Sequence, residues 1–198
     1  MPKKHTHTIL PGRCYHLYNR GINGQDIFYR QDNYRYFLRL YRKHVTPVAD
    51  TFAYCLLKNH FHFLIRAREA RSTAGKMPLS SQEIGLAFGT WLNAYAQAFN
   101  REVGRTGGLF ERPFRRVPIE SEEQLIQNVF YIHANPQKHG FNEDFRSYLH
   151  SSYGGLVSDA STQLNRAEVL SWFGGREKFV AYHEVYHDYL AVMLDSLE

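Results

Sequence analysis

The sequence predicts an α+β fold: a split βαβ sandwich, ferredoxin-like or RRM-like, in which an antiparallel sheet carries two helices on one face. Two observations lead to this prediction. Segments with strand and helix patterns follow one another in the order strand, helix, strand, strand, helix, strand. In the middle of this order, the turn signal Lys58-Asn59 joins two strand-like segments, which predicts an antiparallel hairpin. The 198 residues suffice for one domain with an appendage, and we assign residues 1–155 to the domain and 156–198 to a C-terminal helical extension.

The first part of the predicted fold runs from a strand to the second helix. Residues 14–20 alternate between polar and apolar as a strand does, and Asp32 is expected to cap the helix that follows. The apolar face of that helix consists of Tyr34, Phe37, Leu38 and Tyr41. Residues 48–57 and 60–66 are the two strands of the hairpin. The second helix, residues 81–99, has apolar and aromatic residues at helical spacing and should pack on the sheet.

A third helix begins at Ser121, where a capping box places two carboxylates in the first turn. We expect it to approach the other face of the sheet and to end around Asn135. Pro136 disfavours helical geometry in the residue before it and cannot donate the next backbone hydrogen bond. The extension is predicted to hold two more helices, over residues 165–173 and 176–194.

The composition is that of a basic protein rich in aromatic residues. A net charge of +5, a pI near 9.2, and 14 Tyr and 14 Phe residues are compatible with a polyanionic partner and with rings that stack on bases. The two cysteines have no zinc-ribbon spacing and exclude a disulfide framework. No apolar run is long enough to span a bilayer, and residues 1–13 lack the apolar centre of a secretory signal. We therefore expect a cytoplasmic protein without membrane contacts.

Two histidines lie two positions apart at the start of the second hairpin strand. Because successive strand side chains point to opposite faces, His60 and His62 share one face, about 7 Å apart along the strand. Imidazole is a common metal ligand, so the pair predicts half of a metal site. The alternative is a hydrogen-bonded pair of core histidines. On the third helix, Tyr131 and Asn135 lie one turn apart and share a face that is directed toward the histidines if the helix covers them.

The segment between the second and third helices has the character of a nucleic-acid contact. Arginines alternate with glycines and aromatic residues over residues 101–118, with a strand expected near 114–119. The candidate phosphate contacts are Arg105, Arg112, Arg115 and Arg116. An exposed hairpin with solvated charges explains the same pattern.

Three motifs together resemble a known family. They are Asn59-His60-Phe61-His62, the segment 131–140 with its Tyr-Ile-x-x-Asn-Pro core, and Ser151-Ser152-Tyr153. In this order, over roughly residues 10–155, they resemble the single-tyrosine transposases of the HUH superfamily (histidine-hydrophobe-histidine), in particular the REP-associated tyrosine transposases.

The resemblance implies a role for each matching residue. His60, His62 and Asn135 would bind Mg²⁺ or Mn²⁺, and Tyr131 would attack single-stranded or hairpin DNA to form a covalent 5′-phosphotyrosine and a free 3′-hydroxyl. A phenol with a pKa near 10 is a weak nucleophile, and a divalent cation on the phosphate would make the phosphorus more reactive. Strand transfer would follow when another 3′-hydroxyl attacks the linkage.

Several alternatives stay open at the level of sequence. The chain could instead be a DNA-binding module that no longer cuts, or a metal nuclease that uses water as its nucleophile. Asn135 could be only a helix C-cap, and His133 and His139 are structural residues or proton shuttles. The sequence allows a monomer or a homodimer, with Tyr131 completing the site of its own chain or of a partner.

Overall fold

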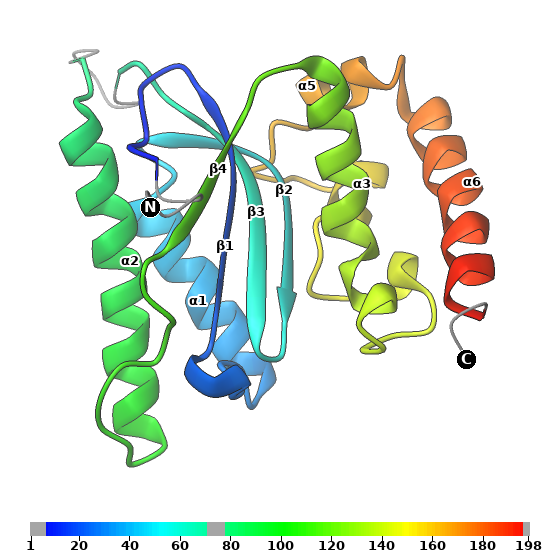
Figure 1. The fold of residues 1–198 in the computed structure, drawn as a ribbon. Coiled ribbons are helices and arrows are strands. Elements are labelled where there is room, and N and C mark those ends of the chain that lie inside the picture. The colour runs from blue at the N-terminus through cyan, green and yellow to red at the C-terminus, as the bar shows by residue number, and fades with distance from the viewer. Residues whose placement is uncertain (1–6, 71–77, 196–198) are drawn as a thin grey trace, which may run out of the picture.

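A four-stranded antiparallel sheet forms the centre of the molecule (Figure 1). The computed structural model describes residues 7–70 and 78–195, with side chains described to residue 185. The strands are β1 (Cys14–Arg20), β2 (Ala49–Leu57), β3 (His60–Ala67) and β4 (Arg115–Ile119), in the spatial order β2-β3-β1-β4. All three strand pairs are antiparallel. The predicted split βαβ fold is therefore confirmed.

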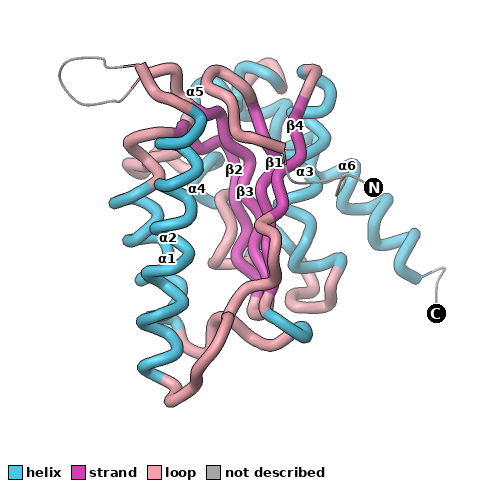
Figure 2. The backbone as a smooth tube through the Cα atoms, turned by 60° about the vertical axis from the view of Figure 1, so that its left-hand side comes forward, coloured by secondary structure: helices cyan, strands magenta, loops and turns pink. Residues whose placement is uncertain are grey.

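The long helices lie on both faces of the sheet (Figure 2). Helices α1 (Gln31–His44) and α2 (Ser81–Glu102) cover one face, and α3 (Glu122–Lys138) packs on the other against β2 and β3. The core between the sheet and the first two helices is built largely of rings, among them Phe37, Phe61, Phe63, Trp91 and Tyr95. None of the helices in the described ranges is long and apolar enough to cross a membrane.

Two short 3-10 helices and three further α-helices complete the described part of the chain. The 3-10 helices are η1 (Ile22–Gly24) and η2 (Phe145–Ser147). The α-helices are α4 (Tyr153–Val157), α5 (Arg166–Trp172) and α6 (Arg176–Asp195). The two helices expected in the extension correspond to α5 and α6.

The start of α1 differs from the prediction. Asp32 is not the N-cap but lies in the first turn, and Arg30 occupies the N-cap position. The Oδ1 atom of Asn33 accepts hydrogen bonds from the backbone N–H groups of Tyr29 and Arg30, at 2.9 and 3.0 Å. An acceptor in the first turn therefore satisfies the backbone amides that come just before the helix.

Helix α3 does not end at Asn135 as predicted but continues through Pro136 to Lys138. The backbone N–H of His139 still donates to the Asn135 carbonyl, at 3.1 Å. A proline inside a helix costs about 3 kcal/mol because one hydrogen bond is lost and the ring crowds the preceding turn. Here Ile132 and Pro136 are both buried, so tertiary packing offsets this local cost.

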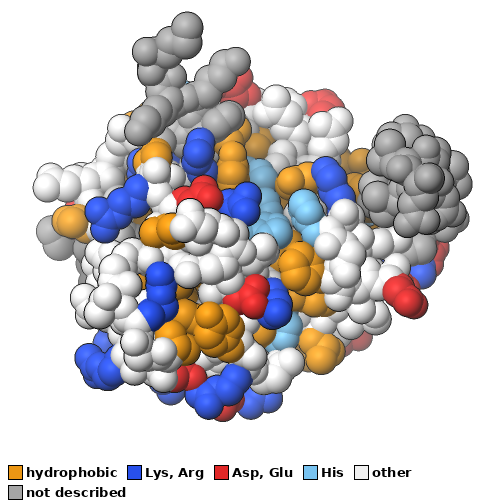
Figure 3. Space-filling view, turned by 60° about the horizontal axis from the view of Figure 1, so that its bottom comes forward, with side chains coloured by type: hydrophobic (Ala, Val, Ile, Leu, Met, Phe, Trp, Pro, Cys, Tyr) orange, Lys and Arg blue, Asp and Glu red, His pale blue; other side chains and the backbone are white. Residues whose placement is uncertain are grey.

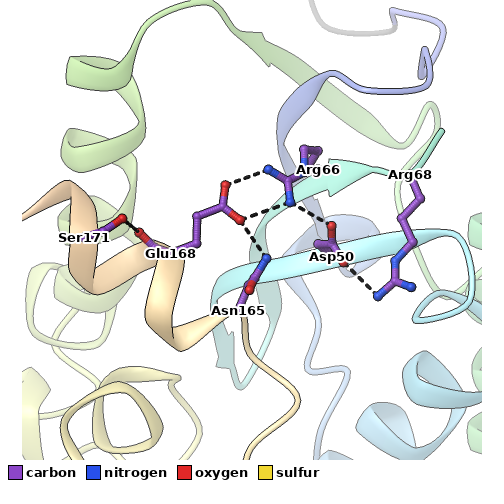
Figure 4. Close-up of polar contacts among 6 residues, drawn as sticks. All are labelled: Asp50, Arg66, Arg68, Asn165, Glu168 and Ser171. Carbon is purple, nitrogen blue, oxygen red and sulfur yellow. Dashed lines mark hydrogen bonds and ion pairs between the residues drawn. The ribbon is translucent and has the colours of Figure 1, made fainter. Parts of the chain in front are cut away.

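The extension packs into a second core on the α3 side of the sheet. That core combines β2, β3 and α3 with the extension through Phe52, Leu64, Val129, Ile132, Leu156, Val169 and Phe179. A polar network, shown in Figure 4, adds a specific attachment of α5 to the sheet. Arg66 donates to both carboxylate oxygens of Glu168, at 2.6 and 3.0 Å, and to Asp50 at 3.0 Å. Asp50 also pairs with Arg68, and Glu168 accepts a hydrogen bond from Asn165.

Helix α6 is attached to α3 by a buried chain of hydrogen bonds. His183 Nδ1 lies 2.8 Å from the Phe179 carbonyl and must donate to it, so His183 Nε2 is an acceptor. His133 Nδ1, 3.0 Å from that nitrogen, must then donate, which leaves His133 Nε2 to accept from the Ser152 hydroxyl at 2.8 Å. Ser152 Oγ in turn accepts the backbone N–H of Tyr54. All donors and acceptors in this series of hydrogen bonds are satisfied only when His133 and His183 are both neutral.

Candidate active site

The two histidines of β3 face helix α3, as the strand alternation requires. His60 and His62 project to the α3 side, whereas Phe61 and Phe63 enter the core beneath α1 and α2. The imidazole centroids of His60 and His62 lie 5.2 Å apart, with the ring planes at 84°. The two rings therefore meet at one place.

Hydrogen bonds at Nδ1 determine which ring nitrogen of each histidine is free. Asn59 Nδ2 donates to the Gly24 carbonyl, which turns Asn59 Oδ1 toward His60. His60 Nδ1, 2.7 Å from that oxygen, must donate, so His60 Nε2 carries a free lone pair. His62 Nδ1 lies 2.9 Å from His16 Nε2. When His62 supplies the proton of that bond, its Nε2 is also free to bind a cation.

The imidazoles are held in the neutral form that a metal ligand requires. Burial, with smaller contributions from the nearby His139 and Arg20, lowers the pKa of His60 to about 4. Burial, followed by the neighbouring His16 and His60, lowers the pKa of His62 well below its ordinary value. Both rings are therefore unprotonated at neutral pH.

Helix α3 brings Tyr131 to the same place. The Tyr131 ring lies 5.7 Å from the His62 ring and 5.8 Å from the His16 ring, measured between centroids, and is perpendicular to the former. Burial raises the pKa of Tyr131 and nearby Tyr18 raises it further, whereas the Asn135 side chain lowers it. The phenol is thus protonated at neutral pH and needs activation before it can act as a nucleophile.

Asn135 is fully buried, and its side chain is only half satisfied. Its Nδ2 donates to the Tyr131 carbonyl at 2.6 Å, whereas its Oδ1 is buried without a hydrogen-bond partner in the described structure. A buried carbonyl oxygen without a partner costs about 1–3 kcal/mol. A bound cation is one group that would satisfy it.

A cleft of about 610 Å³ opens beside the histidines. Its lining includes Tyr18, Arg20, His60, Arg115, His139 and Phe141. The Tyr18 ring stacks on the His62 ring at 5.6 Å, so the cleft leads directly to the histidine pair. At this end of the molecule, histidine side chains reach the surface with lysine and arginine side chains near them (Figure 3).

The four candidate arginines are distributed over different places. Arg115 lies opposite Tyr18 where β4 pairs with β1, and it lines the cleft. Its neighbour Arg116 points to the other face of the sheet, where its guanidinium lies over the Phe114 ring. Arg112 lines an adjoining pocket of about 700 Å³ beside α2. Arg105 donates to Asn100 and to the Gly108 carbonyl, so it braces its own loop. Of the four, only Arg115 lines the histidine cleft.

Sequence reasoning missed several residues of the site. His16 and Tyr18 on β1 lie on the same face as His62, and Arg20 at the end of β1 lines the cleft. Their spacing of two along a predicted strand was the available signal, but the pairing of β1 with β3 was needed to place them. His133, a candidate proton shuttle, lies instead in the buried chain that joins α3 to α6.

The donor atoms present fit a hard or borderline divalent cation. Within the described ranges no group of three or more His, Cys, Asp or Glu side chains is placed to hold a metal ion. A third protein ligand for a site built on His60 and His62 would therefore have to come from another kind of group, such as an amide oxygen. Asn135 supplies a buried oxygen of this kind without a competing hydrogen bond.

Comparison with known proteins identifies relatives of the chain. A Haemophilus influenzae protein named "Putative REP-associated tyrosine transposase" is 27% identical over 106 residues, which are 52% of this chain and 58% of that relative. A solved structure of a REP-associated tyrosine transposase bound to a REP hairpin covers 82% of this chain and 94% of its own, with a TM-score of 0.54 and 14% identity. No family model matches the chain. The resemblance seen in the motifs is confirmed, and the second comparison shows the shared fold.

Proposed function

We propose that this chain, which resembles the REP-associated tyrosine transposases, cuts and rejoins single-stranded or hairpin DNA through a covalent link to Tyr131. One observation carries the proposal: the Tyr131 ring lies 5.7 Å from His62, whose neighbour His60 lines an open cleft. A phenol and two neutral imidazoles thus lie together beside a space that a DNA strand can enter, and Asn135, with its unsatisfied amide oxygen, follows one helical turn after Tyr131. The names of the relatives support the same chemistry.

The reaction exchanges one phosphoester for another. The Tyr131 oxygen attacks the scissile phosphorus, the Oη–P bond forms and the bond from phosphorus to the 3′-oxygen breaks. The phenolic proton leaves and the 3′-oxygen takes up a proton, so that the products are a 5′-phosphotyrosine and a 3′-hydroxyl. Because the ester energy is retained in the linkage, attack by another 3′-hydroxyl reverses the exchange and joins strands without a further energy source.

His60, His62 and Asn135 would hold the cation, Mg²⁺ or Mn²⁺. When bound, it would neutralise charge on the non-bridging phosphate oxygens and make the phosphorus more electrophilic. His16 and Asn59 act on the histidines themselves, because their hydrogen bonds orient the rings and direct Nε2 of each away from the protein partner. His16 and Asn59 are therefore part of the site.

The surface around the cleft suits a DNA strand. Arg115 and Arg20 line the cleft as cations for phosphates, and Tyr18 and Phe141 present rings to bases. Arg112 extends the basic surface toward the pocket beside α2. Arg105 and Arg116 stabilise the loop and the strand that carry Arg112 and Arg115.

Tyr131 acts within its own chain in this proposal, because His62 and Tyr131 of one chain already lie side by side. A monomer is then sufficient for cleavage.

The test is covalency. Incubating the protein with an end-labelled single-stranded hairpin oligonucleotide and Mn²⁺ or Mg²⁺ should give an adduct that survives SDS. A label at the 3′ end of the oligonucleotide should follow the downstream fragment, whose 5′ phosphate is joined to Tyr131, into the protein. A label at the 5′ end should leave with the fragment that carries the free 3′-hydroxyl. Tyr131→Phe should abolish the adduct and EDTA should prevent it. Tyr29→Phe, at a tyrosine with 54% exposure outside the site, should form the adduct at the wild-type rate.

Two other results would replace the proposal. Binding of the hairpin without any adduct, under all metal conditions, would indicate a DNA-binding module that does not cut. Cleavage that persists in Tyr131→Phe would indicate a metal nuclease with water as its nucleophile. His60→Ala and His62→Ala separate the DNA-binding module from the metal nuclease. The nuclease loses its cleavage product in these variants, whereas the binding module has no product to lose.

A further inference from the structure

Helix α3 has a cationic side chain next to the phenol that the motifs did not single out. Lys138 lies seven residues, two helical turns, after Tyr131 and therefore on the same side of the helix. Its ammonium group lies 5.0 Å from the centroid of the Tyr131 ring. This contact exists because α3 continues through Pro136, since a helix that ended at Asn135 would not carry Lys138 along the same face.

The charge of Lys138 also reaches the rest of the site. It is among the groups that lower the pKa of His62 and of His139, so its field acts on one histidine of the pair and on the cleft wall. Lys138 is exposed, and no carboxylate in the described part of the chain pairs with it. The ammonium is therefore free to interact with an anion that enters the cleft.

We infer that Lys138 is a further catalytic residue, which stabilises the negative charge that Tyr131 and the scissile phosphate share during attack. This inference rests on the proposed function. In the free protein the ammonium lies against the electron-rich ring, where a cation–π contact holds it. As the phenol loses its proton and the Oη–P bond forms, negative charge develops on the phenolic and phosphoryl oxygens. A fixed cation at this position stabilises that charge more than it stabilises the neutral phenol.

The assignment distinguishes Lys138 from an ordinary phosphate contact. A lysine that only binds DNA contributes equally before and during attack, so its loss weakens binding and leaves the rate at saturating DNA unchanged. A lysine that acts on developing charge affects the rate at saturation. The arginines of the cleft, such as Arg115, are expected to behave in the first way.

The experiment compares Lys138→Met and Lys138→Arg with Lys43→Met. Lys43 is the matched control, since it is also an exposed lysine in the last turn of a long helix, α1, outside the cleft. Single-turnover adduct formation with saturating hairpin oligonucleotide and Mn²⁺ should be about 10- to 100-fold slower in Lys138→Met. Lys138→Arg should stay within about fivefold of the wild type because the charge is kept. The Kd for the uncut hairpin should change by less than about threefold in all variants.

A second measurement examines the contact without DNA or metal. In protein labelled with ¹³C-tyrosine, the ring resonances of Tyr131, assigned by their loss in Tyr131→Phe, should shift in Lys138→Met and not in Lys43→Met.

Three outcomes would overturn the inference. Equal single-turnover rates in Lys138→Met and Lys43→Met would remove the catalytic role. A weaker Kd with an unchanged rate at saturation would reduce Lys138 to a phosphate contact. Unshifted Tyr131 resonances would show that the ammonium does not lie on the ring. If the wild type itself forms no adduct, the proposed function fails first and the inference fails with it, and the lysine variants are not needed to see this.

Discussion

Acidification should destabilise this protein, and His183 should account for a measurable share of the loss. His183 is fully buried, and burial lowers its pKa to about 4 from an ordinary value of 6.5. Above pH 6.5 the histidine is neutral in both the folded and the unfolded chain, so it does not make the free energy of unfolding depend on pH. Below pH 6.5 the unfolded chain takes up a proton that the folded chain does not, and stability falls until the pH reaches about 4.

The size of the effect follows from the distance between the two pKa values. At pH 5, which is about 1.5 units below the ordinary pKa of 6.5, protonation stabilises the unfolded state by about 1.36 kcal/mol per unit. The free energy of unfolding therefore falls by about 2 kcal/mol. The structural reason is the directed chain of hydrogen bonds. A proton on His183 Nε2 would face the Nδ1–H of His133, because His183 Nδ1 already donates to the Phe179 carbonyl.

The assay is urea unfolding at pH 7, 6 and 5, followed by circular dichroism, of the wild type and His183→Gln. Glutamine offers a donor and an acceptor but does not titrate, so the stability lost between pH 7 and pH 5 should be about 2 kcal/mol smaller in the variant. The exposed His7 provides the control, and His7→Gln should follow the wild-type curve. Equal losses in the wild type and His183→Gln would show that His183 does not contribute to the loss of stability in acid.

Three more predictions concern the extension and the assignment of Tyr131 to its own chain. Phe179→Ala should lower the free energy of unfolding by about 3–5 kcal/mol, since the ring is fully buried, and urea unfolding with the exposed Val185→Ala as control measures this. Glu168→Gln should cost about 1–2 kcal/mol in the same assay, because Arg66 loses its charged bidentate partner, and a loss below 0.3 kcal/mol would contradict the role given to that pair. Mixing Tyr131→Phe chains with His62→Ala chains should not restore the covalent adduct, and recovery of adduct in the mixture would show that the two residues act in different chains.

The order of the elements and the side of the sheet on which the site lies could be predicted from local sequence patterns. Alternation along residues 60–66 separates His60 and His62 from Phe61 and Phe63, and this follows from strand geometry alone. The turn at Lys58-Asn59 similarly required the hairpin. Local signals of this kind act over a few residues, so they can be read from the chain without knowledge of its packing.

Which residues of distant segments meet became evident only from the packing of the folded chain. The pairing of β1 with β3 places His16 against His62, a contact between residues 46 positions apart that no local pattern specifies. The continuation of α3 through Pro136 is a second case, because buried packing outweighs the local preference that predicted an end at Asn135, and Lys138 lies beside Tyr131 as a result. Propensities are worth tenths of a kcal/mol to a few kcal/mol per residue, whereas a packed helix face contributes more in total, so tertiary contacts prevail wherever the two disagree.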